Sequence, residues 1–132
     1  MSDSPPGPYL TIVPQRHTMD CAVCCLAMLL ELSYEDVLLA FKTNVYRTGA
    51  TTRQMLNVAK RLGKPLRFSR AVDPEALESS HGILLIAPEG KVQHTVLLRE
   101  GTIVDTDATL WDADVYLATY KARPLSLLIL RD

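Results

Sequence analysis

The chain has 132 residues, 48% of them hydrophobic and 22% charged, which is enough apolar sequence for the core of one compact domain. Its formal net charge is −1 and no basic block occurs, so we expect no nucleic-acid partner, because phosphates require a positive surface. We also expect no membrane span, since no apolar run reaches the roughly 18 residues that cross a bilayer.

The first ten residues, MSDSPPGPYL, are polar and proline-rich and lack the basic and apolar regions of a signal peptide. We interpret residues 1–8 as a disordered lead-in and residues 9–132 as a single domain. With no export signal, the expected location is the cytoplasm, where thiols stay reduced. Three cysteines, two of them adjacent, therefore do not indicate a disulfide scaffold.

Three helices are predicted in the first half of the chain, each beginning at a residue type that favours the N-cap position. Gly63 follows the third helix at the place where a left-handed glycine commonly ends one. The three helices are expected at residues 21–32 with Asp20 as the cap, at 33–41 from Ser33 with Asp36 as its capping partner, and at 51–63 from Thr51 or Thr52.

The second half has the short apolar runs of a sheet. Residues 92–98 and 102–104 read as a hairpin with its turn at 99–101. Because the helices come first and the sheet follows, we expect an α+β fold with the helices packed on one side of an antiparallel sheet. The remaining elements are expected as strands in 65–71, 82–88 and 124–130, a helical turn at 73–80, and a helix or turn at 111–120.

All three cysteines, Cys21, Cys24 and Cys25, lie at the start of the first predicted helix. A zinc site with His17 or His94 as fourth ligand would use the C-x2-C spacing, but the turn and the second Cys/His pair of a zinc knuckle are missing. A redox C-x-x-C motif would require a preceding strand. We therefore expect no metal and no cofactor, with Cys24 and Cys25 as small buried hydrophobic residues.

Cys21 differs from the other two cysteines because it occupies the first turn of the helix. There the backbone N–H groups lack intrahelical partners and the helix dipole is positive, and both favour a thiolate. The pKa of Cys21 should therefore fall below the usual value of about 8.5. A nucleophilic cysteine also needs a base, a group that orients the base, and a donor for the oxyanion.

The stretch Gln15, Asp20-Cys21-Ala22, Leu26 and Met28 resembles the N-terminal motif of the peptidase C39 family. These papain-like cysteine peptidase domains are best known at the N-termini of bacteriocin-exporting ABC transporters, where they remove double-glycine leader peptides. The resemblance implies Cys21 as the nucleophile and Gln15, six residues earlier, as the side-chain donor to the oxyanion. Ala22 stands where the family usually has glycine.

The second half of the family motif is a histidine that starts a hairpin and an aspartate on the returning strand. His94 and Asp105 stand at these places, and residues 49–63 resemble the family's helix that begins Gly-x-[ST] and ends Leu-Gly. Asp105 would fix the imidazole tautomer while His94 takes the proton of Cys21. The chain departs from the pattern at Thr106, which replaces the usual proline. Asp107 is an acidic rival to Asp105, and we prefer Asp105.

The resemblance implies a papain-like α+β fold and a cysteine peptidase that cleaves a peptide or protein substrate, possible partners including a separate ABC exporter. Two alternatives stay open: a non-catalytic docking module for a secretion substrate, and an amide or acyl transferase that uses the same triad.

Overall fold

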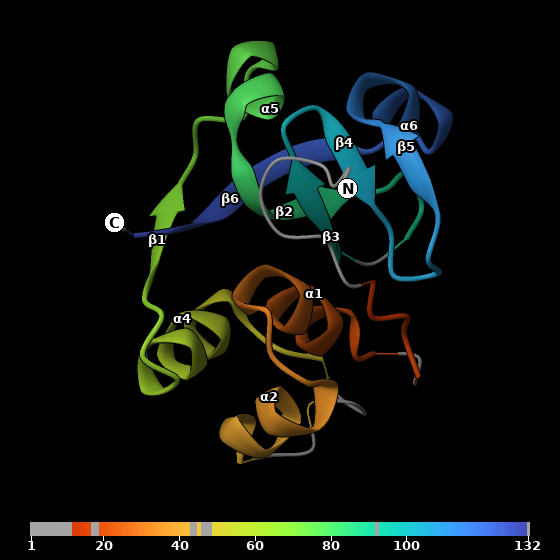
Figure 1. Cartoon of the computed structure of the whole chain (residues 1–132). Helices are drawn as coiled ribbons and strands as arrows, with labels where there is room; N and C mark the ends of the chain where they lie inside the picture. The colour runs from red at the N-terminus through yellow and green to blue at the C-terminus, as the bar shows by residue number, and fades with distance from the viewer. Residues whose placement is uncertain (1–11, 17–18, 43–44, 46–48, 92, 132) are drawn as a thin grey trace, which may run out of the picture.

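A six-stranded antiparallel sheet, with the strand order β1-β6-β2-β3-β4-β5, lies at the centre of this computed structural model (Figure 1). The structure describes residues 12–16, 19–42, 45, 49–91 and 93–131. The predicted lead-in at residues 1–8 and His17 lie outside the described residues. The strands are β1 (Leu66–Ser69), β2 (His81–Ala87), β3 (His94–Arg99), β4 (Thr102–Val104), β5 (Leu110–Asp112) and β6 (Arg123–Leu130).

Helices α1 (Cys21–Leu30), α2 (Tyr34–Phe41) and α4 (Thr52–Arg61) pack together against one face of this sheet (Figure 1). Ile83 and Leu85 of β2 point into the core that these helices cover. The expected α+β architecture, with N-terminal helices on an antiparallel sheet, is therefore confirmed.

The opposite face of the sheet is also covered, by two short helices at the places where the sequence predicted a helical turn and a helix or turn. Helices α5 (Pro74–Ser79) and α6 (Ala113–Thr119) cover that face, and their buried side chains form one core cluster with Leu84 and Ile86 of β2. Since successive strand residues point to opposite faces, the unbroken apolar run in β2 needs a cover on both sides.

The predicted hairpin is confirmed as β3 and β4, which pair from Leu97↔Val104 to Arg99↔Thr102. A two-residue turn joins them, and both turn residues have positive φ: 45° at Glu100 and 85° at Gly101. Such a turn matches the right-handed twist of the two strands. It places the start of β3 and the end of β4 side by side at the open end of the hairpin.

Helix α1 runs through the core, since all its residues after Cys21 are buried. It ends at Leu30, two residues before the predicted end, because Glu31 adopts a left-handed conformation with φ of 58°. Cys24 and Cys25 have no exposed surface and belong to the core beneath the sheet, as predicted. None of the helices in the described part of the chain is long and apolar enough to cross a membrane.

Two of the predicted helix caps are present, and one is not as predicted. Ser33 accepts the backbone N–H of Asp36, and Thr51 forms a full capping box with Gln54. Asp20 occupies the N-cap position of α1, but its side chain makes no capping hydrogen bond. Its backbone, with φ of −100° and ψ of 20°, is outside the extended region of a capping residue.

The Asp20 carboxylate instead joins two other segments. It is buried, and its Oδ2 accepts the Tyr34 hydroxyl at 2.6 Å and the backbone N–H of Arg16 at 3.1 Å. Asp20 thus ties the segment before α1 to the start of α2, and its side chain leaves the first N–H groups of α1 uncapped.

Candidate active site

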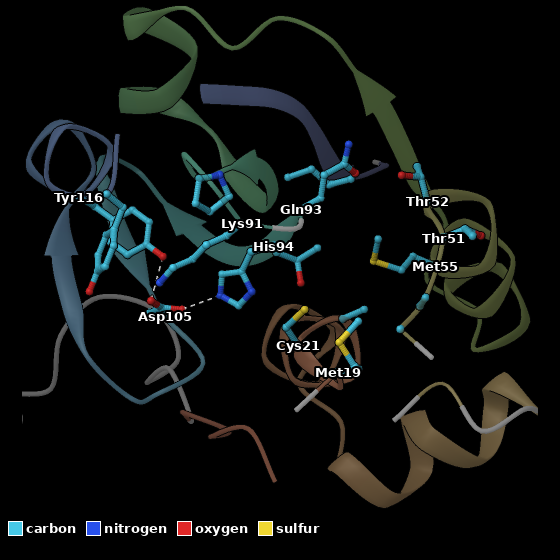
Figure 2. A pocket seen from close by; sticks show the side chains of 17 residues that line it. Met19, Cys21, Thr51, Thr52, Met55, Lys91, Gln93, His94, Asp105 and Tyr116 are labelled. Carbon is cyan, nitrogen blue, oxygen red and sulfur yellow. Dashed lines mark hydrogen bonds and ion pairs between the residues drawn. The ribbon is translucent and has the colours of Figure 1, made fainter. Parts of the chain in front are cut away.

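Three of the predicted site residues come together where α1 meets the hairpin (Figure 2). Cys21 is the first residue of α1, His94 is the first residue of β3, and Asp105 directly follows β4. In Figure 2 the His94 ring lies between the thiol of Cys21 and the carboxylate of Asp105. All three line one cavity: Cys21 comes from the helix, and His94 and Asp105 come from the hairpin.

The carboxylate that contacts His94 belongs to Asp105. Its Oδ1 lies 2.9 Å from Nε2 of His94. Asp107 is exposed, and its Oδ1 accepts the backbone N–H of Thr109 at 3.1 Å within the same turn. Of the two acidic candidates, the structure brings Asp105 to the histidine.

The Asp105 carboxylate has two further donors. Oδ1 accepts the backbone N–H of Thr106 at 2.8 Å, and Oδ2 accepts the Tyr116 hydroxyl at 2.8 Å. Burial by itself raises the pKa of Asp105, but the hydrogen bonds from His94, Tyr116 and Thr106 outweigh it and lower the pKa below the usual value. Asp105 is therefore a fixed negative charge behind His94.

His94 is held in one orientation by this carboxylate. Because Nε2 faces Asp105, Nδ1 is the ring nitrogen that serves Cys21. Burial opposes protonation of the ring, but hydrogen bonds to Asp105 and Cys21 and their negative charges outweigh it and raise the pKa of His94 to about 9. His94 is thus mainly an imidazolium at neutral pH.

Cys21 has the matching shift. Burial raises the pKa of its thiol, but hydrogen bonds from His94 and Thr95 and the charge of His94 outweigh the burial and lower the pKa. Its place at the N-terminus of α1 acts in the same direction. The opposite pKa shifts of Cys21 and His94 thus favour a thiolate beside an imidazolium at the wall of the cavity.

Cys24 and Cys25 behave as inert thiols. Burial and the negative charges nearby raise the pKa of Cys24 to about 12 and the pKa of Cys25 well above its usual value. Both side chains therefore stay protonated in the core, and Cys25 Sγ contacts Thr95 Oγ1 at 3.7 Å. Only Cys21 of the three cysteines is partly exposed.

Gln15, the fourth predicted residue, lies on the segment before α1 and is bound to Thr106. Its backbone N–H donates to the Thr106 carbonyl at 2.6 Å, and its Oε1 accepts the Thr106 hydroxyl at 2.7 Å. It is outside the set of residues that line the cavity. The structure therefore brings Gln15 beside the residue that follows Asp105, and its role as oxyanion donor stays a prediction.

The cavity has a volume of about 820 Å³ and is mainly apolar around Cys21. Gly49 forms part of its wall with φ of +79°, and a Cβ there would lie 3.3 Å from Met19 Cε. A side chain at this position would be strained and would narrow the cavity. The lining residues are Met19, Cys21, Ala22, Gly49, Ala50, Thr51, Thr52, Met55, Leu85, Pro88, Lys91, Gln93, His94, Thr95, Asp105, Tyr116 and Tyr120.

Three residues of this site were missed in the sequence. Thr95 contacts Cys21, Tyr116 binds Asp105, and Thr106 joins Asp105 to Gln15. Thr95 and Thr106 directly follow His94 and Asp105 in the sequence, and this adjacency could have indicated them. Tyr116 comes from α6, eleven residues beyond Asp105, and nothing in its local sequence marks it.

The C-x2-C cysteines are free thiols on one helix, and within the described ranges no group of three or more His, Cys, Asp or Glu side chains could hold a metal ion.

A cysteine at the N-terminus of a buried helix, facing a histidine that a carboxylate orients, is the arrangement of papain-like cysteine peptidases. Residues 10–121 match the sequence profile described as the Peptidase C39 family. The chain therefore belongs to the peptidase C39 family, as its motifs indicated.

Two solved structures are similar to this chain throughout its length. One is the peptidase domain of Streptococcus ComA, described as a bifunctional ABC transporter involved in a quorum-sensing pathway; it has 20% identity, a TM-score of 0.66, and coverage of 93% of this chain and 100% of that one. The other is the peptidase domain of Streptococcus mutans ComA, with 20% identity, a TM-score of 0.61, and coverage of 92% and 98%. These likenesses confirm the papain-like α+β fold. A comparison with curated protein sequences gave no match.

Proposed function

We propose that this chain is a cysteine peptidase that cleaves a peptide bond with Cys21 as nucleophile, His94 as acid and base, and Asp105 as the group that orients His94. The observation that carries the proposal is the geometry at the cavity wall: Cys21 begins α1, His94 begins β3 beside it, and Asp105 Oδ1 lies 2.9 Å from His94 Nε2. The lowered pKa of Cys21 and the pKa of His94, raised to about 9, favour the same assignment. This pairing is what an activated cysteine nucleophile requires.

In the first step the Cys21 thiolate attacks the carbonyl carbon of the scissile bond and the carbonyl oxygen becomes an oxyanion. The backbone N–H of Cys21, at the open N-terminus of α1, and the side-chain amide of Gln15 donate to this oxygen. His94 gives its proton to the leaving amine as the C–N bond breaks, which leaves a thioester on Cys21. Water then attacks the thioester with His94 as base, releasing the acid and restoring the thiolate.

The substrate we propose is a peptide or protein, with a leader peptide as the particular candidate. The support for this is that both similar structures are peptidase domains of ABC transporters. The chain would then act on the cytoplasmic side, in trans with a separate exporter. An open cavity of about 820 Å³ is large enough for several residues of an extended peptide.

The experiment is a peptide-library digestion by the full chain, read by mass spectrometry, with Cys21→Ala and Cys24→Ala compared with the wild type. Peptides that contain a double glycine are included as one subset. Cleavage by the wild type and by Cys24→Ala, but not by Cys21→Ala, is the expected result. Cleavage that survives Cys21→Ala would contradict the proposal.

The other uses of this scaffold give different results in the same experiment. Peptides that bind the wild type and are never cut would indicate a docking module. Products that carry an added amine in place of water would indicate acyl transfer, because an amine would then have resolved the thioester.

A further inference from the structure

We infer that Thr106 is a positioning residue that holds the Gln15 side chain and the Asp105 carboxylate in a fixed relation to one another. Thr106 itself touches no reacting atom in the proposed mechanism. It acts through two partners: Gln15, the proposed donor to the oxyanion, and Asp105, which orients His94. The inference deepens the proposed peptidase function and rests on it for the role of Gln15.

All the hydrogen-bonding groups of Thr106 are used. Its N–H donates to Asp105 Oδ1 at 2.8 Å, its hydroxyl donates to Gln15 Oε1 at 2.7 Å, and its carbonyl accepts the Gln15 backbone N–H at 2.6 Å. Thr106 is 2% exposed, so water does not compete for these groups. Bonds of this kind fix geometry most strongly where solvent is excluded.

The hydroxyl contact orients the Gln15 amide as well as anchoring it. A glutamine amide has an acceptor end and a donor end on opposite sides of one plane. When Oε1 accepts from Thr106, the NH₂ end must point away from Thr106. Threonine suits this task because its branched Cβ restricts χ1, so the hydroxyl has few alternative directions.

The identity of residue 106 matters because the C39 motif usually has proline after the aspartate. Proline has neither an N–H nor a hydroxyl. Of the three hydrogen bonds at Thr106, it would keep only the one at the carbonyl. This chain therefore couples the two halves of its site by contacts that the Asp-Pro form of the motif lacks.

The segment that bears Gln15 gains a second attachment close by. The backbone N–H of Arg16 donates to the buried Asp20 carboxylate at 3.1 Å. Thr106 thus holds Gln15 beside the hairpin, whereas Asp20 holds Arg16 beside α1. Loss of the Thr106 hydroxyl would remove its hydrogen bond to Gln15 Oε1 and leave the backbone path in place.

The test compares Thr106→Val with Thr106→Ser. Valine removes the hydroxyl, keeps the shape, and keeps both backbone hydrogen bonds, whereas serine keeps the hydroxyl. We expect Thr106→Val to lower kcat for peptide cleavage at least 10-fold with little change in KM, and Thr106→Ser to restore most of it. An oxyanion donor of this kind is worth roughly 100-fold to 1000-fold in kcat.

Two further measurements separate this role from a general structural one. The rate of Cys21 alkylation and its pH profile should be unchanged in Thr106→Val, because Cys21, His94 and Asp105 keep their contacts. In a Gln15→Ala background, Thr106→Val should cost less than 3-fold more. Thr119→Val is the matched control, since its exposed hydroxyl donates to the Val115 carbonyl at 2.7 Å.

A readout that needs no substrate keeps the inference separate from the proposed function. The side-chain NH₂ resonances of Gln15 in an NMR spectrum should be similar in the wild type and in Thr106→Ser, and should shift in Thr106→Val. If no peptide is ever cleaved, the proposed function fails while this spectrum still decides the inference. Unchanged Gln15 resonances, or an undiminished kcat, in Thr106→Val would overturn it.

Discussion

His94 Nε2 lies 2.9 Å from Oδ1 of Asp105, although the ladder between their strands does not pair these two residues. The register that pairs Leu97 with Val104, if continued, would set residue 107 opposite residue 94. The ladder stops at Val104, and the chain turns so that the Asp105 N–H donates to the Thr109 carbonyl at 2.9 Å. This turn delivers Asp105 to the histidine and leaves Asp107 in solvent.

Asp105→Asn should therefore inactivate the enzyme, and Asp107→Asn should not. Without the carboxylate, the pKa of His94 should fall from about 9 toward its ordinary value, and the thiolate should lose its partner at neutral pH. We expect activity to fall about 100-fold or more, by analogy with the orienting carboxylate of other triads. The measurements are kcat/KM and an NMR titration of His94 in both variants. Equal losses in the two variants would assign no special role to Asp105.

The Tyr116 hydroxyl supports the same carboxylate from α6. Tyr116→Phe removes the 2.8 Å bond to Asp105 Oδ2 and keeps the ring that packs against Trp111. The pKa of Asp105 should rise, because the hydrogen bond from Tyr116 helps to lower it. Stability should drop by about 1–3 kcal/mol, because a buried carboxylate oxygen loses its donor. An NMR titration of Asp105 and a denaturant melt test this, and an unaltered Asp105 pKa would contradict it.

The three cysteines should separate cleanly by function. Cys21→Ala should abolish cleavage and leave stability nearly unchanged, since this side chain is partly exposed at the helix start. Cys24→Ala and Cys25→Ala should keep cleavage and cost about 1–2 kcal/mol of stability each, because each leaves a small cavity in the core. Denaturant melts and cleavage assays on the three variants make the comparison. Loss of cleavage in a folded Cys24→Ala protein would contradict the assignment.

The bond from Tyr34 to Asp20 should matter for stability. Tyr34→Phe leaves the buried Asp20 carboxylate without its 2.6 Å donor, and we expect a loss of about 1–3 kcal/mol. The adjacent surface pair offers the control. Glu35→Gln weakens an exposed contact to Arg16 and should change stability by less than about 1 kcal/mol. If both variants melt alike, Asp20 does not tie the two segments as described.

The parts of this fold that depend on local sequence could be predicted. The cap at Ser33 and the turn at Glu100 each follow from residues within a few positions of one another. Helix α1 starts at Cys21 as predicted, but without the side-chain cap from Asp20 on which the prediction depended. The contact between His94 and Asp105 could be predicted because one hairpin holds both. The family motif was the basis for predicting Cys21 in the same site.

The parts that depend on tertiary contacts could not be predicted. Asp20 has the residue type of a cap, but the buried Tyr34 hydroxyl offers its carboxylate a better donor. Helix α6 begins at Ala113, directly after strand β5 ends at Asp112. The pairing of β5 with β4, a tertiary contact, sets this boundary. The Thr106 contact with Gln15 joins positions 91 residues apart, beyond any local pattern.

The most direct test of the central claim is the rate of iodoacetamide alkylation at Cys21 as a function of pH, in the wild type and in His94→Ala, followed by peptide mass spectrometry. Because the pKa of Cys21 is lowered and that of His94 is raised to about 9, the thiolate of Cys21 is favoured below the usual pKa of a thiol. The account predicts that Cys21 of the wild type reacts rapidly well below pH 8.5, far ahead of Cys24 and Cys25, and that His94→Ala shifts its titration upward. An ordinary thiol titration at Cys21 in both proteins would contradict the account.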